Sequence, residues 1–165
     1  MKLNTLNDLL LHELQDIRSF EEQLLDAIPR MAQAARNPDL RKALEDHLKE
    51  TQEQLIRVKG LLSSMGAPAS GSKCAGMAGI IKEGSEILAL GGDPAVVDAG
   101  IIGAAQRVEH YEIAVYGTVR SLAETLGLHN VASVLQESLD EEKAADEKLT
   151  TISEPVNSAA GSRRA

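Results

Sequence analysis

Two glutamates occupy positions where an amphipathic helix would place an aliphatic side chain in its core. Glu112 lies in a stripe of apolar residues at helical spacing, which also contains Ile101, Ala105, Val108, Val115, Val119, Leu122 and Leu126. Glu21 has the same place in an earlier stripe, with Leu10, Leu14, Ile17, Leu24, Ile28, Met31 and Ala35. A buried carboxylate must be protonated, paired or bound to a cation, because leaving it uncompensated is costly. The spacing therefore predicts a buried site that holds a counter-charge.

An internal repeat relates these glutamates to two others. Glu21 and Glu112 are 91 residues apart (112 − 21), and Glu50 and Glu141 are separated by the same interval (141 − 50). The same offset also superimposes apolar residues, among them the pairs Ile17 and Val108, Leu24 and Val115, Leu44 and Leu135, and Val58 and Leu149. Amphipathic helices match one another easily in hydrophobicity, so the shared glutamates carry most of the weight. The repeat predicts two similar helical hairpins.

Two hairpins around a pseudo-two-fold axis would bring Glu21, Glu50, Glu112 and Glu141 together at the centre of a bundle. This arrangement is typical of di-iron and di-manganese sites, where hard oxygen ligands hold two metal ions. Further ligands are expected from the same helices: His47, Glu109, Glu142 and Asp146. The sequence therefore predicts a dinuclear metal centre with these eight residues as candidate ligands.

The chain departs from the usual di-metal pattern at its histidines. In that pattern the second helix of each hairpin carries Glu-x-x-His. Here the order is reversed, with His47 before Glu50, and the segment 130–152 has no histidine. We expect Glu109, one helical turn before Glu112, and either Glu142 or Asp146 to compensate for the missing nitrogen ligand.

Composition indicates an all-α protein. The 165 residues suit one domain, and the only aromatic residues are Phe20, Tyr111 and Tyr116, without tryptophan. Helices packed through aliphatic side chains are typical of such a composition. The formal net charge is −8, and no helix face forms a stripe of Lys and Arg, so the sequence offers no electrostatic support for nucleic-acid binding.

The sequence contains no signal for a membrane or for export. No apolar run approaches the roughly 20 residues that a spanning helix needs, and the first residues already follow an amphipathic pattern rather than that of a signal peptide. The single cysteine, Cys74, cannot form an internal disulfide, in agreement with a reducing compartment. We therefore expect a soluble, cytoplasmic protein.

Four long amphipathic segments and one short one must position the site. Long helices are expected over residues 5–35, 38–64, 93–126 and 130–152, with start signals at Asn37-Pro38 and Asp93-Pro94. Residues 66–92 hold one short apolar helix around 77–90. This segment is long enough for a crossover between parallel helices, which is typical of ferritin-like bundles. We expect residues 1–153 to form the bundle and residues 154–165 to form a flexible polar tail.

Four groups of residues together resemble one known family. They are His47-Leu-Lys-Glu50-Thr51, Lys73-Cys74-Ala-Gly-Met77, Glu109-His-Tyr-Glu112-Ile-Ala with Tyr116-Gly117, and Glu141-Glu142-Lys143 with Asp146 and Leu149. With these motifs the chain resembles the bacterial YciE/YciF family of ferritin-like stress proteins. The resemblance implies a ferritin-like four-helix bundle, a dinuclear metal centre, a homodimer and a link to stress response. It implies no settled reaction.

Two classes of function remain open from the sequence. The first is a di-metal protein of oxidase or peroxidase type, in which iron or manganese reacts with O2 or peroxide. Phe20 and Tyr111 are equivalent in the repeat and adjoin Glu21 and Glu112, so they are placed to shield the site. The second is a structural or interaction protein without catalytic turnover, whose glutamates are neutralised by protonation or water. Iron storage in a cage is disfavoured, since nothing in the sequence specifies cage assembly.

Overall fold

The computed structural model describes residues 2–68 and 70–162. Over this part of the chain it contains five α-helices and no strand. The helices are α1 (Leu6–Ala34), α2 (Pro38–Ser64), α3 (Ala75–Leu90), α4 (Pro94–Thr125) and α5 (His129–Gly161). The predicted all-α class, the four long helices and the short extra helix are thereby confirmed.

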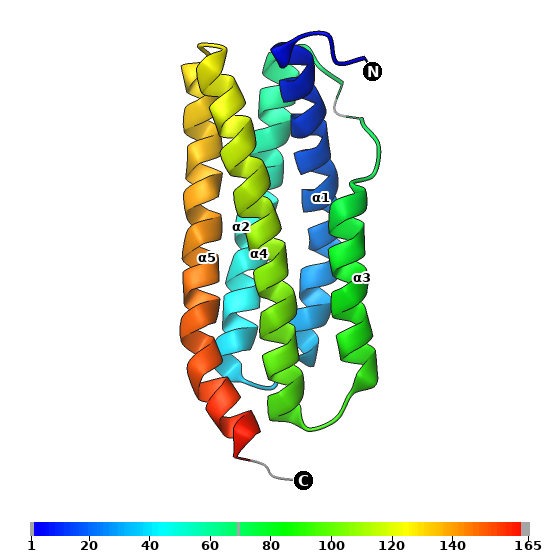
Figure 1. The fold of residues 1–165 in the computed structure, drawn as a ribbon, viewed down its shortest axis with the longest axis vertical. Helices are drawn as coiled ribbons and strands as arrows, with labels where there is room; N and C mark the ends of the chain where they lie inside the picture. The colour runs from blue at the N-terminus through cyan, green and yellow to red at the C-terminus, as the bar shows by residue number, and fades with distance from the viewer. Residues whose placement is uncertain (1, 69, 163–165) are drawn as a thin grey trace.

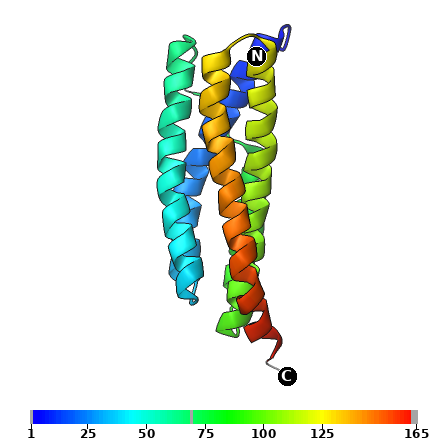
Figure 2. The same ribbon diagram turned by 90° about the vertical axis from the view of Figure 1, so that its left-hand side faces the viewer.

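The four long helices form a bundle of two antiparallel hairpins, α1 with α2 and α4 with α5 (Figures 1 and 2). The hairpins pack together through α1 against α4 and α2 against α5. Because α2 and α4 run in the same direction, the chain must return along the bundle between them, and α3 makes this return on the outside of α1 and α4 (Figure 1). One long crossover between two hairpins is the predicted ferritin-like topology.

Local signals at the helix starts explain where the helices begin. The Thr5 hydroxyl accepts a hydrogen bond from the backbone N–H of Asp8, whose carboxylate accepts one from the N–H of Thr5, a capping box at α1. The side chains of Asn37 and Asp93 cap α2 and α4 by accepting hydrogen bonds from backbone N–H groups, and each is followed by a proline at the first helical position. Both predicted start signals are confirmed.

A buried carboxylate ties the two hairpins together at one end of the bundle. Asp98 on α4 is 3% exposed, and its oxygens accept hydrogen bonds from the backbone N–H groups of Arg36 and Asn37 at 2.8 and 2.7 Å. The turn between α1 and α2 therefore binds directly to the first turns of α4. The sequence analysis did not identify this contact.

The structure differs from the sequence prediction in two places. The buried face of α4 passes through Tyr116, which is fully buried, rather than through Val115, which is only partly buried. At the other end, α5 continues to Gly161 instead of ending near residue 152, because Val156 extends the spacing of Leu149 and Ile152 and is buried. Most of the predicted flexible tail is thus helical, and residues 163–165 lie outside the described part of the chain.

No helix in the described residues is both long enough and apolar enough to cross a membrane.

Candidate metal centre

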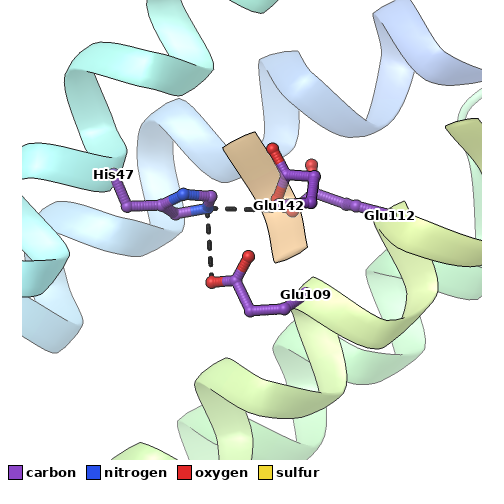
Figure 3. A group of neighbouring side chains, drawn as sticks. All are labelled: His47, Glu109, Glu112 and Glu142. Carbon is purple, nitrogen blue, oxygen red and sulfur yellow. Dashed lines mark ion pairs between the residues drawn. The ribbon is translucent and has the colours of Figure 1, made fainter. Parts of the chain in front are cut away.

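Four side chains from three helices meet inside the bundle (Figure 3). His47 comes from α2, Glu109 and Glu112 come from α4, and Glu142 comes from α5. Each offers one possible ligand atom, these atoms all lie within 4.8 Å of one another, and all four residues are buried. We call this group the His47 cluster. All of its members are among the ligands predicted from the sequence.

Helix periodicity explains why these residues face inward. Along α2 the buried stripe runs through Leu40, Leu44, His47, Thr51, Gln54 and Val58, and along α5 it runs through Val131, Leu135, Ser138, Glu142, Leu149 and Ile152. Steps of three and four residues keep one helix face toward the partner helices. Glu142 lies on this stripe, whereas its neighbour Glu141 is rotated away from it. The position equivalent to Glu142 in the first hairpin is therefore Thr51, since 142 − 51 is again 91.

Polar atoms in the cluster have too few partners. The Nε2 atom of His47 lies 3.5 Å from Oε1 of Glu109 and 3.7 Å from Oε2 of Glu112, farther than a normal hydrogen bond. Several buried atoms have no hydrogen-bond partner among the described residues: Oε2 of Glu21, both ring nitrogens of His47, Oε1 of Gln54, Oε2 of Glu109, both oxygens of Glu112 and Oε2 of Glu142. Such orphaned groups are rare in folded proteins. They are also the nitrogen and oxygen donors that iron or manganese uses, so the residues fit a metal centre.

The pKa values of the buried groups also fit a metal centre. Burial, followed by repulsion from Glu142 and the other acids, raises the pKa of Glu21 and Glu112 well above the usual range. Burial also raises the pKa of Glu109, although attraction to His47 opposes this. For His47, burial favours the neutral ring, but the surrounding acids, Glu109 first, outweigh it and raise the pKa to about 10. Without metal, the site contains more acid than base.

Glu21 lies beside the His47 cluster on α1. It is fully buried, and its Oε1 accepts a hydrogen bond of 2.5 Å from the hydroxyl of Tyr116. The charge of Glu21 raises the pKa of both Glu112 and His47, so Glu21 lies close to the cluster. Glu21 and Glu112 therefore both face the bundle interior, as their shared place in the repeat predicts.

Besides Glu21, three other predicted ligands lie outside the cluster. Glu50 has a side chain that is 42% exposed, with Oε2 at 3.6 Å from Nδ1 of His47, on the other edge of the ring. Glu141 makes a two-pronged ion pair with Arg57, at 2.6 and 2.7 Å. Asp146 lies 3.3 Å from Nδ1 of His110. The predicted convergence of the four repeat-related glutamates is thus met by Glu21 and Glu112 but not by Glu50 and Glu141, because the latter pair lies one residue off the buried stripe.

Gln54 was not predicted from the sequence as part of the site. This residue is fully buried on α2, two turns after His47, and its amide N–H group donates hydrogen bonds to Oε2 of Glu141 at 2.9 Å and to Oε1 of Glu142. It thereby fixes the carboxylate of Glu142 in the cluster. The signal was present, since Gln54 follows His47 and Thr51 as a third polar residue on an otherwise aliphatic stripe.

The three aromatic rings form a row on one side of the site. Phe20 makes edge-to-face contacts with both Tyr111 and Tyr116, with ring centroids 5.8 and 6.0 Å apart. Tyr116 reaches Glu21, and the hydroxyl of Tyr111 lies 3.1 Å from Sγ of Cys74. The row extends from Tyr116, which contacts Glu21, to Tyr111, which contacts Cys74 at the start of α3.

Two cavities reach the site from different sides. One, of about 230 Å³, lies mainly between α1, α3 and α4 and is lined mostly by apolar side chains. The other, of about 250 Å³, lies between α2 and α5 and is lined by charged side chains, including Asp46, Glu50 and Lys148. Both have His47 and Glu109 in their walls. The site is therefore buried but approachable.

Comparisons with known proteins agree on one family. Residues 5–160 match the family described as a domain of unknown function (DUF892). The chain is 42% identical over 153 residues to protein YciF of Escherichia coli K12, covering 92% of each chain.

Solved structures show the same fold. The E. coli stress protein YciF has a TM-score of 0.90 at 40% identity, over 94% of this chain and 98% of that one. YcfI of Rhodopseudomonas palustris, described as a candidate structural protein, has a TM-score of 0.88 at 44% identity, over 91% and 96%. A protein from Xanthomonas campestris has a TM-score of 0.78 at 26% identity, over 94% and 95%.

Proposed function

The chain belongs to the YciF-like family of stress proteins, and on this premise we propose that its bundle holds a dinuclear iron or manganese centre that oxidises Fe(II) with O2 or peroxide. The observation that carries the proposal is the His47 cluster, in which buried ligand atoms from three helices converge without hydrogen-bond partners among the described residues. A pair of divalent cations would neutralise the acids and satisfy these atoms at once.

We assign ligands by their positions around the cluster. One metal ion would be held by Nε2 of His47 and by Glu109, Glu112 and Glu142, the four groups that lie within 4.8 Å of one another. A second would be held by Glu21, which is fully buried on α1 and keeps one carboxylate oxygen without a partner among the described residues, together with Glu112 and Glu142. Glu112 and Glu142 would then contribute to holding both ions.

Other residues would orient these ligands rather than bind metal. Glu50 faces Nδ1 of His47, which is where a positioning carboxylate acts on a metal-bound imidazole. Tyr116 donates to Glu21, and Gln54 donates to Glu142. Arg57 holds Glu141 outside the site, and Asp146 lies beside His110 instead.

Iron in this centre would supply the electrons that reduce O2 or peroxide. The chain's own part is to hold the ions in an anionic set of oxygen ligands, which stabilises the oxidised metal. Ile17 and Leu24, one turn before and after Glu21, and Val108, next to Glu109, are buried and would restrict water around the ligands. The hydroxyl of Tyr116 holds a proton against Glu21. Oxidation in such an enclosed site would suit protection during stress.

The second candidate function is a structural protein with no turnover. It is favoured by the likeness to YcfI and by the raised pKa of Glu21, Glu109 and Glu112, since protonated carboxyls can be buried without metal.

We further infer that the protein acts as a homodimer in the cytoplasm, as the family resemblance implies. Light scattering after gel filtration measures the oligomeric state.

Anaerobic loading with Fe(II), followed by peroxide and stopped-flow absorbance, separates the two functions. We expect the wild-type protein to oxidise bound Fe(II) about a hundredfold faster than a Glu112→Gln variant, because that change removes a shared ligand. Glu83→Gln is the matched control, since Glu83 is exposed on α3. Equal rates in all three proteins would favour the structural function.

A further inference from the structure

The apolar cavity beside the site is built by small residues. Between α1, α3 and α4, its walls contain Ala27, Gly84, Ala104 and Ala105, where larger aliphatic side chains would close the space. α3 lies as close to α4 as its side chains permit, since a Cβ on Gly84 would stand 3.3 Å from that of Ala104. The cavity of about 230 Å³ is therefore not the result of a loosely packed helix. An apolar cavity costs stability unless something fills it.

Its size and lining suit a short hydrocarbon chain. Aliphatic side chains such as Leu24, Ile28, Ile80 and Leu88 make up most of the wall. A cavity of about 150 Å³ with a similar lining can take up benzene. The larger volume here has room for an alkyl chain of about eight carbons, by the same comparison. His47 and Glu109 also line the cavity, so a chain inside it would lie against the His47 cluster.

One cation marks the rim of the cavity. Arg30 lines it, is exposed, and makes no hydrogen bond or ion pair with the residues that the structure describes. Ser85, also exposed, lies on the same rim from α3. In a chain of net charge −8, an unpaired guanidinium beside an apolar cavity favours a ligand with an anionic head and an apolar tail.

We propose that this cavity binds a medium-chain aliphatic carboxylate, with its carboxylate at Arg30 and its alkyl tail directed between α1, α3 and α4 toward His47 and Glu109. The position of the tail beside a metal centre rests on the proposed function, whereas binding itself does not require metal. A bound tail excludes water from this side of the His47 cluster and leaves the polar cavity between α2 and α5 as the open approach.

Calorimetric titration of the full-length, metal-free protein with octanoate tests the proposal. We expect saturable binding of one octanoate per chain, about tenfold or more tighter than that of butanoate, because each buried methylene adds to the affinity. Octyltrimethylammonium, with the same tail and the opposite charge, should bind about tenfold more weakly than octanoate. Absence of saturable octanoate binding overturns the proposal.

Substitutions at the rim and inside the cavity test where octanoate binds. Arg30→Met should weaken octanoate about fivefold to tenfold and leave 1-octanol unchanged, while Arg107→Met, at an exposed arginine of α4 outside the cavity, should change neither. Ala105→Leu should abolish binding of both ligands by filling the cavity. If that variant does not fold, Ser85→Leu replaces it as the test, because it places a larger side chain at the exposed rim and obstructs the cavity there. Wild-type affinity in the filled variant, or equal effects of the two arginine changes, overturns the proposal.

Metal binding, measured separately on the same proteins, distinguishes this inference from the proposed function. Loss of octanoate binding in Ala105→Leu with unchanged Fe(II) binding supports a separate ligand cavity. Octanoate binding by a wild-type protein that takes up no metal leaves the cavity proposal standing and contradicts the proposed function.

Discussion

His47 has different neighbours at its two ring nitrogens, and this difference assigns roles to the acids around it. Nε2 faces Glu109 and Glu112, both buried, while Nδ1 faces the half-exposed Glu50. A metal-bound histidine commonly presents its second nitrogen to a carboxylate, which fixes the tautomer and the ring orientation. In the proposed centre, Glu50 would therefore act on the metal through His47.

Glu50→Ala should weaken metal binding without abolishing it. Loss of an outer partner of a metal-bound histidine typically costs about tenfold to a hundredfold in affinity, whereas His47→Ala should remove a ligand and cost more. Competition of Mn(II) with a chelating dye measures both. Glu45→Ala, at an exposed position on the same helix, is the control. A loss as large as that of His47→Ala would show that Glu50 is itself a ligand.

The buried acids also set how stability depends on pH in the metal-free protein. The pKa values of Glu21, Glu109 and Glu112 are raised by burial and repulsion, and that of His47 is raised to about 10 by the surrounding acids. Between the unfolded and folded pKa values, the folded state binds more protons than the unfolded state, so the free energy of unfolding falls as pH rises.

We therefore expect the metal-free protein to be more stable at pH 6 than at pH 8, about 1 kcal/mol or more by urea unfolding. Added Mn(II) should stabilise it more strongly at pH 8, because protons compete less with the metal for the ligands. Glu112→Gln should flatten the pH dependence. Greater stability of the metal-free protein at pH 8 would contradict the electrostatic description of the site.

At the scale of helices, the sequence predicted the elements well and the inward faces less well. Capping residues and proline at Asn37 and Asp93 gave the starts of α2 and α4, because those signals are local. The choice between Glu141 and Glu142 is not local. Both acids lie near the buried face of α5. Which of them faces the bundle interior depends on the packing of α5 against α2, where Arg57 and Gln54 bind Glu141.

The internal repeat predicted one pair of buried glutamates correctly and the other pair wrongly. It located Glu21 and Glu112, whose helices have equivalent places in the two hairpins, but it also paired Glu50 with Glu141 because both are glutamates. Following the stripe of steps of three and four residues on α5 selects Glu142 instead, and on α2 it selects His47, Thr51 and Gln54. Hydrophobic spacing was thus a better guide to the buried polar residues than identity between the repeats.

One contact between elements is expected to matter for folding. Asp98→Ala leaves the backbone N–H groups of Arg36 and Asn37 without their acceptor at the turn between α1 and α2. Losing two charge-assisted hydrogen bonds should lower the free energy of unfolding by about 2–4 kcal/mol, measured by urea denaturation. Asp26→Ala, at an exposed position of α1, should change it little. An equally small effect at Asp98 would show that α4 does not need this anchor.

For the whole molecule, two hairpins and a crossover produce an enclosed site with two unlike approaches. In the His47 cluster, α4 supplies Glu109 and Glu112, and α2 and α5 supply His47 and Glu142 (Figure 3). α3 turns one side of the bundle into an apolar cavity, and the gap between α2 and α5 forms a charged one.

The most direct test of the central claim is anomalous X-ray diffraction from crystals loaded anaerobically with Fe(II), with data collected on both sides of the iron absorption edge. We expect two iron peaks inside the bundle, one bounded by His47, Glu109, Glu112 and Glu142 and the other by Glu21, Glu112 and Glu142. Crystals of Glu112→Gln should lose at least one of them, since this residue is assigned to both ions. Iron found only at surface carboxylates, or no iron peak at the His47 cluster, would contradict a metal centre at this site.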